Sequence, residues 1–107
     1  MITAHELVDT IEVLDAVALQ RWIDMGWIIP ARESEEIRFD PSDVARVHLI
    51  CELHYELHID EDSLSVVLSL LDQLYATRRT LAALVSAVAA QPDDVQARIS
   101  KLVAGTS

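Results

Sequence analysis

Apolar positions recur every three to four residues over most of the chain, which is the pattern of amphipathic helices. Thr3 followed by Glu6 is a capping-box signal, and it predicts a helix of about two turns that ends near Thr10. Asp15 is a second N-cap signal and Gly26 supplies a helix stop, so a second short helix is expected between them. Two short helices joined by a brief turn form a helix-turn-helix.

Two short β-prone segments follow, and they predict a small hairpin of the kind called a wing. Residues 27–30 are apolar and close with proline, residues 37–39 alternate, and the residues between them are mostly charged. Asp40 and Pro41 then give an N-cap and a first helical position. We expect a helix from there to about His58, because no breaker occurs before that point.

A long helix is expected from about Ser63 to Ala90, capped by Asp60 or Asp62. Its apolar positions alternate spacings of four and three, which is typical of a coiled-coil seam. Such a helix would be about 40 Å long, more than one small chain covers, so we expect a second copy to bury it. The seam residues expected at the dimer interface are Leu64, Leu68, Leu71, Tyr75, Arg78 and Val85.

These elements predict a mainly all-α fold with a small β-hairpin wing: a winged helix-turn-helix followed by a long dimerisation helix. Residues 1–60 are expected to form the helix-turn-helix domain, and residues 61–107 the long helix and a short C-terminal helix. Pro92 separates those two helices. Asp93 or Asp94 is expected to cap the last helix, which would fold back on the long one.

Charge is concentrated on the half that should hold the helix-turn-helix. Residues 1–60 contain four arginines and thirteen acidic residues, a net charge of −9, whereas residues 61–107 contain four cations and five acids, a net charge of −1. A surface near −9 repels a polyanion, so we expect a basic protein partner in place of nucleic acid. The acidic residues expected to supply its contacts are Asp24, Glu33, Glu35, Glu36, Glu56, Asp60 and Glu61.

Other chemistry has weaker support. His48, Cys51, His54 and His58 are spaced by three, three and four on one expected helix, so a zinc or copper site is geometrically conceivable. No second ligand cluster accompanies them, and we expect no metal and no cofactor. The chain lacks a glycine-rich phosphate loop, and we expect no enzymatic activity. A single cysteine and the lack of a long apolar run favour a cytoplasmic protein that does not enter the membrane.

The order of these motifs resembles the MerR-type winged helix-turn-helix. The matching segments are Leu19–Trp22, Gly26–Pro30, Arg38-Phe39 and Asp43-Val44. The continuation is similar to the CbpM-type chaperone modulators. It consists of residues 45–53, residues 57–59 and the apolar segment 65–72, which ends in Leu-Leu-Asp.

The CbpM resemblance implies a cytoplasmic protein that binds the J-domain of a CbpA- or DnaJ-like co-chaperone. By covering the basic helix of that J-domain, the protein would inhibit the co-chaperone's work with the Hsp70 chaperone DnaK. The charge pattern of residues 1–60 agrees with such a partner.

Two alternatives stay open. The first is a MerR-like transcriptional regulator whose second helix and wing contact DNA phosphates through Arg21, Arg32, Arg38 and Arg46. Gln20 stands where DNA-reading relatives usually carry arginine, and the wing is acidic, so both features weaken this role. The second alternative is a metal-sensing dimer that uses Cys51, His54 and His58.

Overall fold

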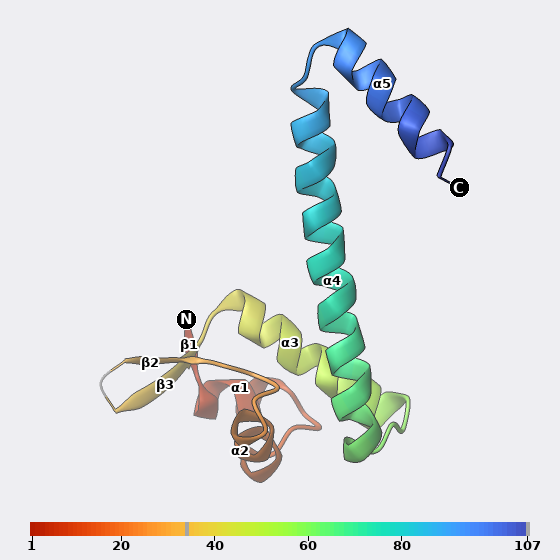
Figure 1. The fold of residues 1–107 in the computed structure, drawn as a ribbon. Helices are drawn as coiled ribbons and strands as arrows, with labels where there is room; N and C mark the ends of the chain where they lie inside the picture. The colour runs from red at the N-terminus through yellow and green to blue at the C-terminus, as the bar shows by residue number, and fades with distance from the viewer. Residues whose placement is uncertain (34, 107) are drawn as a thin grey trace. The chain divides into compact units, whose positions relative to one another are not determined.

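The computed structural model describes residues 1–33 and 35–106, and it divides the chain into two compact units, Met1–Leu68 and Ser69–Ser107. Figure 1 labels the elements, and it confirms a mainly α-helical fold with a small β-wing. In chain order they are β1 (Ile2–Thr3), α1 (Ala4–Thr10), α2 (Ala16–Asp24), β2 (Ala31–Glu33), β3 (Glu36–Phe39), α3 (Pro41–Cys51), the π-helix η1 (Glu52–Glu56), α4 (Glu61–Ala89) and α5 (Asp93–Ala104).

The capping signals at the starts of α1, α2 and α3 are confirmed. Thr3 Oγ1 accepts from the N–H of Glu6 at 3.2 Å, and Asp15 Oδ1 accepts from an N–H in the first turn of α2 at 2.7 Å. Asp40 and Asp43 form a reciprocal capping box at the start of α3. These contacts satisfy N–H groups that have no partner within the helix, which is why α1, α2 and α3 begin where they do.

Gly26 ends the turn after α2 with a φ of +77°, a conformation that residues with a Cβ adopt rarely. The N–H of Trp27 then donates to the carbonyl of Trp22 at 3.0 Å. The chain therefore leaves α2 with both tryptophans directed into the core.

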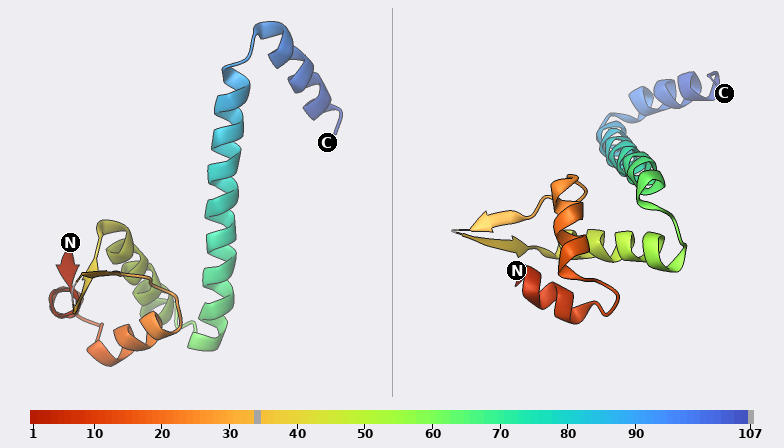
Figure 2. Two further views of the ribbon diagram at one scale, coloured as in Figure 1. Left: turned by 60° about the vertical axis from the view of Figure 1, so that its left-hand side comes forward. Right: turned by 90° about the horizontal axis from the view of Figure 1, so that it is seen from below.

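The wing belongs to a three-stranded antiparallel sheet in the order β1-β3-β2. Ile2 lies opposite Phe39, and Ala31 lies opposite Arg38. The sheet differs from the sequence-based expectation at two places. The first wing strand begins at Ala31, not at Trp27, because residues 27 and 28 are buried in the core and Pro30 lacks an N–H for a ladder. The N-terminal strand β1 was not expected. Figure 2 shows the hairpin extending beyond α1, α2 and α3.

One hydrophobic core lies within residues 1–68. Trp22 and Phe39 are fully buried and Trp27 is 8% exposed, as the helix-turn-helix pattern predicts. Leu64 and Leu68 also belong to this core, so the first turns of α4 group with the helix-turn-helix. The sequence placed the division between residues 60 and 61, whereas contacts place it after residue 68.

The prediction of one α-helix from Pro41 to about His58 is wrong at its C-terminal end. The α-helix ends at Cys51 and continues as η1, whose hydrogen bond from the N–H of Leu57 to the carbonyl of Glu52 closes a wider turn at 3.0 Å. His58 follows with a φ of 56°. Residue types alone do not distinguish a π-turn from an α-turn, since both satisfy the backbone within the helix.

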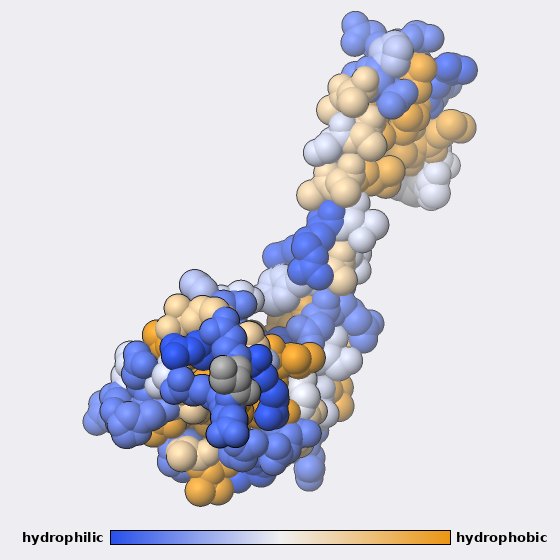
Figure 3. All heavy atoms as spheres, turned by 90° about the vertical axis from the view of Figure 1, so that its left-hand side faces the viewer, coloured by the Kyte–Doolittle hydropathy of each residue, from blue (hydrophilic) through white to orange (hydrophobic). Residues whose placement is uncertain are grey.

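In the second unit, α5 turns back after Pro92 at the end of α4 (Figure 1). The N-cap is Pro92, so the expectation that Asp93 or Asp94 caps this helix is wrong; both lie in its first turn, where acids favour the helix dipole. No described residue of 69–106 is buried, so α5 does not pack along α4 as expected. Apolar side chains gather on this unit's surface in Figure 3.

Candidate partner-binding surface

The exposed face of α2 is the part of a helix-turn-helix that meets a ligand. Here it carries one cation, Arg21, besides the uncharged Gln20 and the acidic Asp24. Gln20 and Asp24 both lie on this face, and Gln20 Nε2 donates to Asp24 Oδ1 at 2.9 Å. Asp24, one of the acids expected to contact a partner, is exposed.

The cation of α2 is held by a carboxylate of its own chain. Arg21 Nε donates to both Glu61 oxygens at 2.9 Å, and the indole Nε1–H of Trp22 donates to Glu61 Oε1 at 3.1 Å. The hydrogen bond from Arg21 holds the pKa of Glu61 below its ordinary value, although desolvation opposes the shift. Glu61, which the sequence analysis placed among the acids expected to contact a partner, therefore joins α2 to the start of α4 within its own chain.

Arg38 in the wing is also paired with carboxylates of its own chain. Arg38 Nη2 donates to Glu36 Oε2 at 2.9 Å, and Arg38 Nε lies 3.8 Å from Glu33 Oε2. Glu35 is exposed, and so is Arg32, which makes no ion pair with the described residues. The wing therefore presents more carboxylate than guanidinium to a ligand.

Arg46 on α3 is partly buried, and its Nε donates to the carbonyl of Trp27 at 3.0 Å. Three of the four arginines in residues 1–60 are thus engaged by acceptors of their own chain, at Arg21, Arg38 and Arg46. In the first compact unit, four arginines face fifteen acidic residues, a net charge of −11; in the second, four cations face three acids, a net charge of +1.

Asp60 and Glu61 differ from the other acids that were expected to contact a partner. Asp60 Oδ1 accepts from the N–H of Ser63 at 2.7 Å and caps α4, and this hydrogen bond lowers the pKa of Asp60. Glu56 is exposed on η1. Asp60 and Glu61 therefore hold the start of α4, while Asp24, Glu35 and Glu56 remain on the surface. The ion pair between Arg21 and Glu61 joins residues forty positions apart, and no local signal in the sequence indicates it.

Acid should weaken the Glu61 contact. Because the pKa of Glu61 is lowered in the fold, its contribution is full above the unfolded value near 4.5 and is lost as pH falls through the folded value. We expect Glu61→Gln to lower the free energy of unfolding by about 1 kcal/mol at pH 7. Urea unfolding at several pH values measures this difference, which should shrink below about pH 4.5. A difference that stays constant down to pH 3 would contradict the role of the ionised carboxylate.

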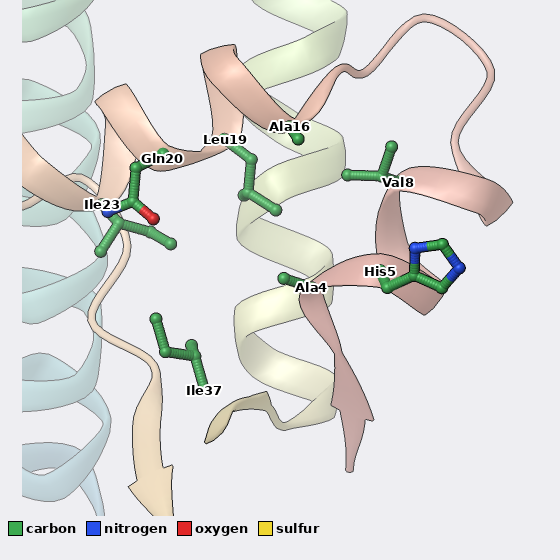
Figure 4. Close-up of a pocket in the computed structure, with 8 residues that line it drawn as sticks. All are labelled: Ala4, His5, Val8, Ala16, Leu19, Gln20, Ile23 and Ile37. Atoms are coloured by element: carbon green, nitrogen blue, oxygen red, sulfur yellow. The ribbon is translucent and has the colours of Figure 1, made fainter. Parts of the chain in front are cut away.

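A groove of about 260 Å³ lies between α1, α2 and β3. Figure 4 shows Leu19 and Ile23 from α2 and Ile37 from β3 facing this groove, with the ring of His5 at its outer side. Gln20 supplies its other polar group, and no carboxylate lines it. Sequence reasoning missed this groove, because its apolar residues have the same periodicity as core residues.

The expected dimer seam separates into two parts. Leu64 and Leu68 are buried in the core of their own chain, so they are not free to meet a second copy. Leu71 is partly buried, whereas Tyr75, Arg78 and Val85 are exposed. The other large exposed apolar residues of α4 are Val66, Leu70, Leu74, Leu81 and Leu84.

The histidines near Cys51 have different surroundings. His54 Nδ1 hydrogen-bonds the carbonyl of Ile59 at 2.8 Å, which requires the proton on Nδ1, and His48 and His58 are exposed. Burial raises the pKa of the Cys51 thiol to about 11, so it stays protonated at neutral pH. Among the described residues, no group of three potential ligands stands close enough to hold a metal ion.

Among residues 1–33 and 35–106, no helix has the length and apolar character needed to cross a membrane. The family model of MerR HTH family regulatory proteins matches residues 2–85, from β1 through most of α4. Neither a curated protein nor a solved structure matches the chain at a significant level. With its two short helices, its wing and the long helix that follows, the chain belongs to the MerR HTH family of regulatory proteins.

Proposed function

We propose that this MerR-family chain is a chaperone modulator of the CbpM type. It binds the J-domain of a CbpA- or DnaJ-like co-chaperone and keeps that domain from DnaK. The observation that carries the proposal is the electrostatic state of the first unit, which has a net charge of −11. Such a surface attracts a cationic partner and repels a polyanion.

The arginines support the same conclusion. A helix-turn-helix that binds DNA places cations of its second helix and wing against phosphates. Here Arg21 is committed to Glu61 and Arg38 to Glu36 and Glu33. Releasing either arginine to a phosphate would leave its carboxylate partner beside another anion, which adds repulsion to the cost of the lost ion pair.

The mechanism we propose is masking. J-domains meet DnaK through a basic helix, and an acidic surface that covers this helix occupies the same groups. Summed charge speeds the encounter, whereas the contacts at close range determine how long the complex lasts. The exposed acids Asp24, Glu35 and Glu56 are available for such contacts, together with the wing residues Glu33 and Glu36.

The second unit supports a proposal of homodimerisation. Its large apolar side chains are exposed along α4 and α5, with Leu81, Leu84 and Val85 between 58% and 59% exposed and Leu102 at 73%. An isolated chain leaves most of the surface of these side chains in water, and a second copy with the same surface provides the complement.

The test compares the two ligands on the same protein. An isolated J-domain of the CbpA type and a fluorescent DNA duplex are each titrated with the wild-type chain at about 50 mM and about 200 mM salt. We expect saturable binding of the J-domain, weaker at the higher salt concentration, and no saturation with the duplex. Saturable binding to the duplex that falls steeply with salt, together with an inert J-domain, would establish the DNA-binding alternative instead.

A further inference from the structure

A second groove, of about 330 Å³, lies on η1 and has a different chemistry from the groove beside α2. We call it the η1 groove. One wall is the segment between α1 and α2, which contributes Ile11 and Val13. The other wall is the end of α3 and η1, which contributes Glu52, Tyr55 and Glu56 among others.

The floor of the η1 groove is apolar. Ile11 and Cys51 are nearly buried beneath it, and the thiol stays neutral because burial raises its pKa to about 11. Val13 is 54% exposed, and Tyr55 is partly buried. The groove therefore offers apolar surface to a ligand, and covering that surface would be favourable.

The rim of the η1 groove is acidic. Glu52 and Glu56 are both exposed, and both line the groove from positions four residues apart on η1. The lining residues include one histidine, His48, and no lysine or arginine. The wider turn of η1 sets the spacing of the two carboxylates, since its hydrogen bond runs from Leu57 back to Glu52.

These features fit an amphipathic helix that carries lysine or arginine beside apolar residues. Its apolar side chains would cover Val13 and Tyr55, and its cations would reach Glu52 and Glu56. The groove beside α2 fits such a ligand less well, because no carboxylate lines it. The wing fits it less well too, because Glu33 and Glu36 already face Arg38.

We propose that the η1 groove is the docking site for a cationic amphipathic helix. The identification of that helix as the basic helix of a J-domain rests on the function proposed above. None of the lining residues belongs to the second helix or the wing, so the family's helix-turn-helix would take its protein partner through a surface other than its DNA-reading one. A π-turn at this place agrees with the frequent occurrence of such turns at functional sites.

The experiment measures the affinity of two ligands for wild-type chain and for Glu52→Lys/Glu56→Lys. The ligands are an isolated J-domain of the CbpA type and a synthetic lysine- and leucine-containing helical peptide. The matched control, Glu6→Lys/Asp62→Lys, changes the net charge of the chain equally at two exposed acids that do not line the groove and have no proposed partner contact. We expect the groove variant to lose at least about tenfold in affinity for both ligands, and the control to lose less than about threefold, through steering alone.

A milder variant, Glu52→Gln/Glu56→Gln, guards against an effect on folding, and it should lose affinity in the same direction with an unchanged far-ultraviolet circular dichroism spectrum. Equal losses in the groove variant and the Glu6→Lys/Asp62→Lys control would overturn the inference while the proposed function stands. Binding of the peptide, but not the J-domain, with the groove dependence intact would sustain the inference and refute the proposed function. If the groove variant altered self-association but left ligand affinity unchanged, the groove would be an interface between copies and the inference would be wrong.

Discussion

Trp22→Ala is expected to unfold much of the first unit. Trp22 is fully buried, and its ring centroid lies 6.5 Å from that of Trp27 and 6.3 Å from that of Tyr55. Truncation leaves a cavity among these rings and removes a hydrogen bond to Glu61, at a cost of about 3–5 kcal/mol. The free energy of unfolding of a small domain is about 5–15 kcal/mol, so this loss is a large part of its stability. Urea unfolding followed by circular dichroism measures it.

Two further variants show which property of Trp22 matters. Trp22→Phe keeps an aromatic ring and loses the indole N–H, so it should cost less than the alanine variant. Val17→Ala on the same helix changes a side chain that is 73% exposed, and it should shift stability by no more than about 0.5 kcal/mol. An unfolding midpoint of Trp22→Ala equal to that of Val17→Ala would show that the core is not organised around this tryptophan.

Charge introduced on the apolar stripe of α4 is expected to convert a dimer into monomers. The wild-type chain should sediment with twice the mass of one chain at micromolar concentration if, as we propose, a second copy covers the exposed leucines of α4. Leu81→Glu/Leu84→Glu places two carboxylates on that stripe, and burying them without partners costs several kcal/mol. Analytical ultracentrifugation over a range of concentrations measures the change in mass.

The matched control places the same charges on the opposite side of the helix. At 3.6 residues per turn, Ala76 and Ala83 lie roughly opposite the middle of the exposed stripe formed by Leu84, Leu81, Val85 and Tyr75, and both alanines are exposed. Ala76→Glu/Ala83→Glu should leave the mass at that of the dimer. If both double variants dissociated equally, net charge would be the cause, and the proposed seam would be wrong.

The sequence predicted the starts of α1, α2 and α3 well because capping is local. Thr3, Asp15 and Asp40 each accept a hydrogen bond from an N–H within three residues, so the residues that form a cap stand together in the sequence. The buried Trp22 fits the amphipathic spacing of α2, since core residues recur with the period of the element.

Features that depend on distant residues were not predictable in the same way. β1 has two residues, too few for a period, and it forms because Ile2 and Thr3 pair with β3 across the fold. Glu61 looked like one of several surface acids until the fold brought it against Arg21 and Trp22. Glu52 was not singled out as a site residue, because a carboxylate in so acidic a chain carries no signal until a groove forms beside it.

Competition for the J-domain tests the central claim most directly. A labelled J-domain is bound to DnaK, and wild-type chain is added in increasing amounts while the labelled complex is monitored by fluorescence anisotropy. If the acidic unit masks the basic helix, the J-domain should dissociate from DnaK as the chain saturates the J-domain. Added salt should weaken this competition. A DnaK complex that persists unchanged under a saturating excess of the chain would contradict the account.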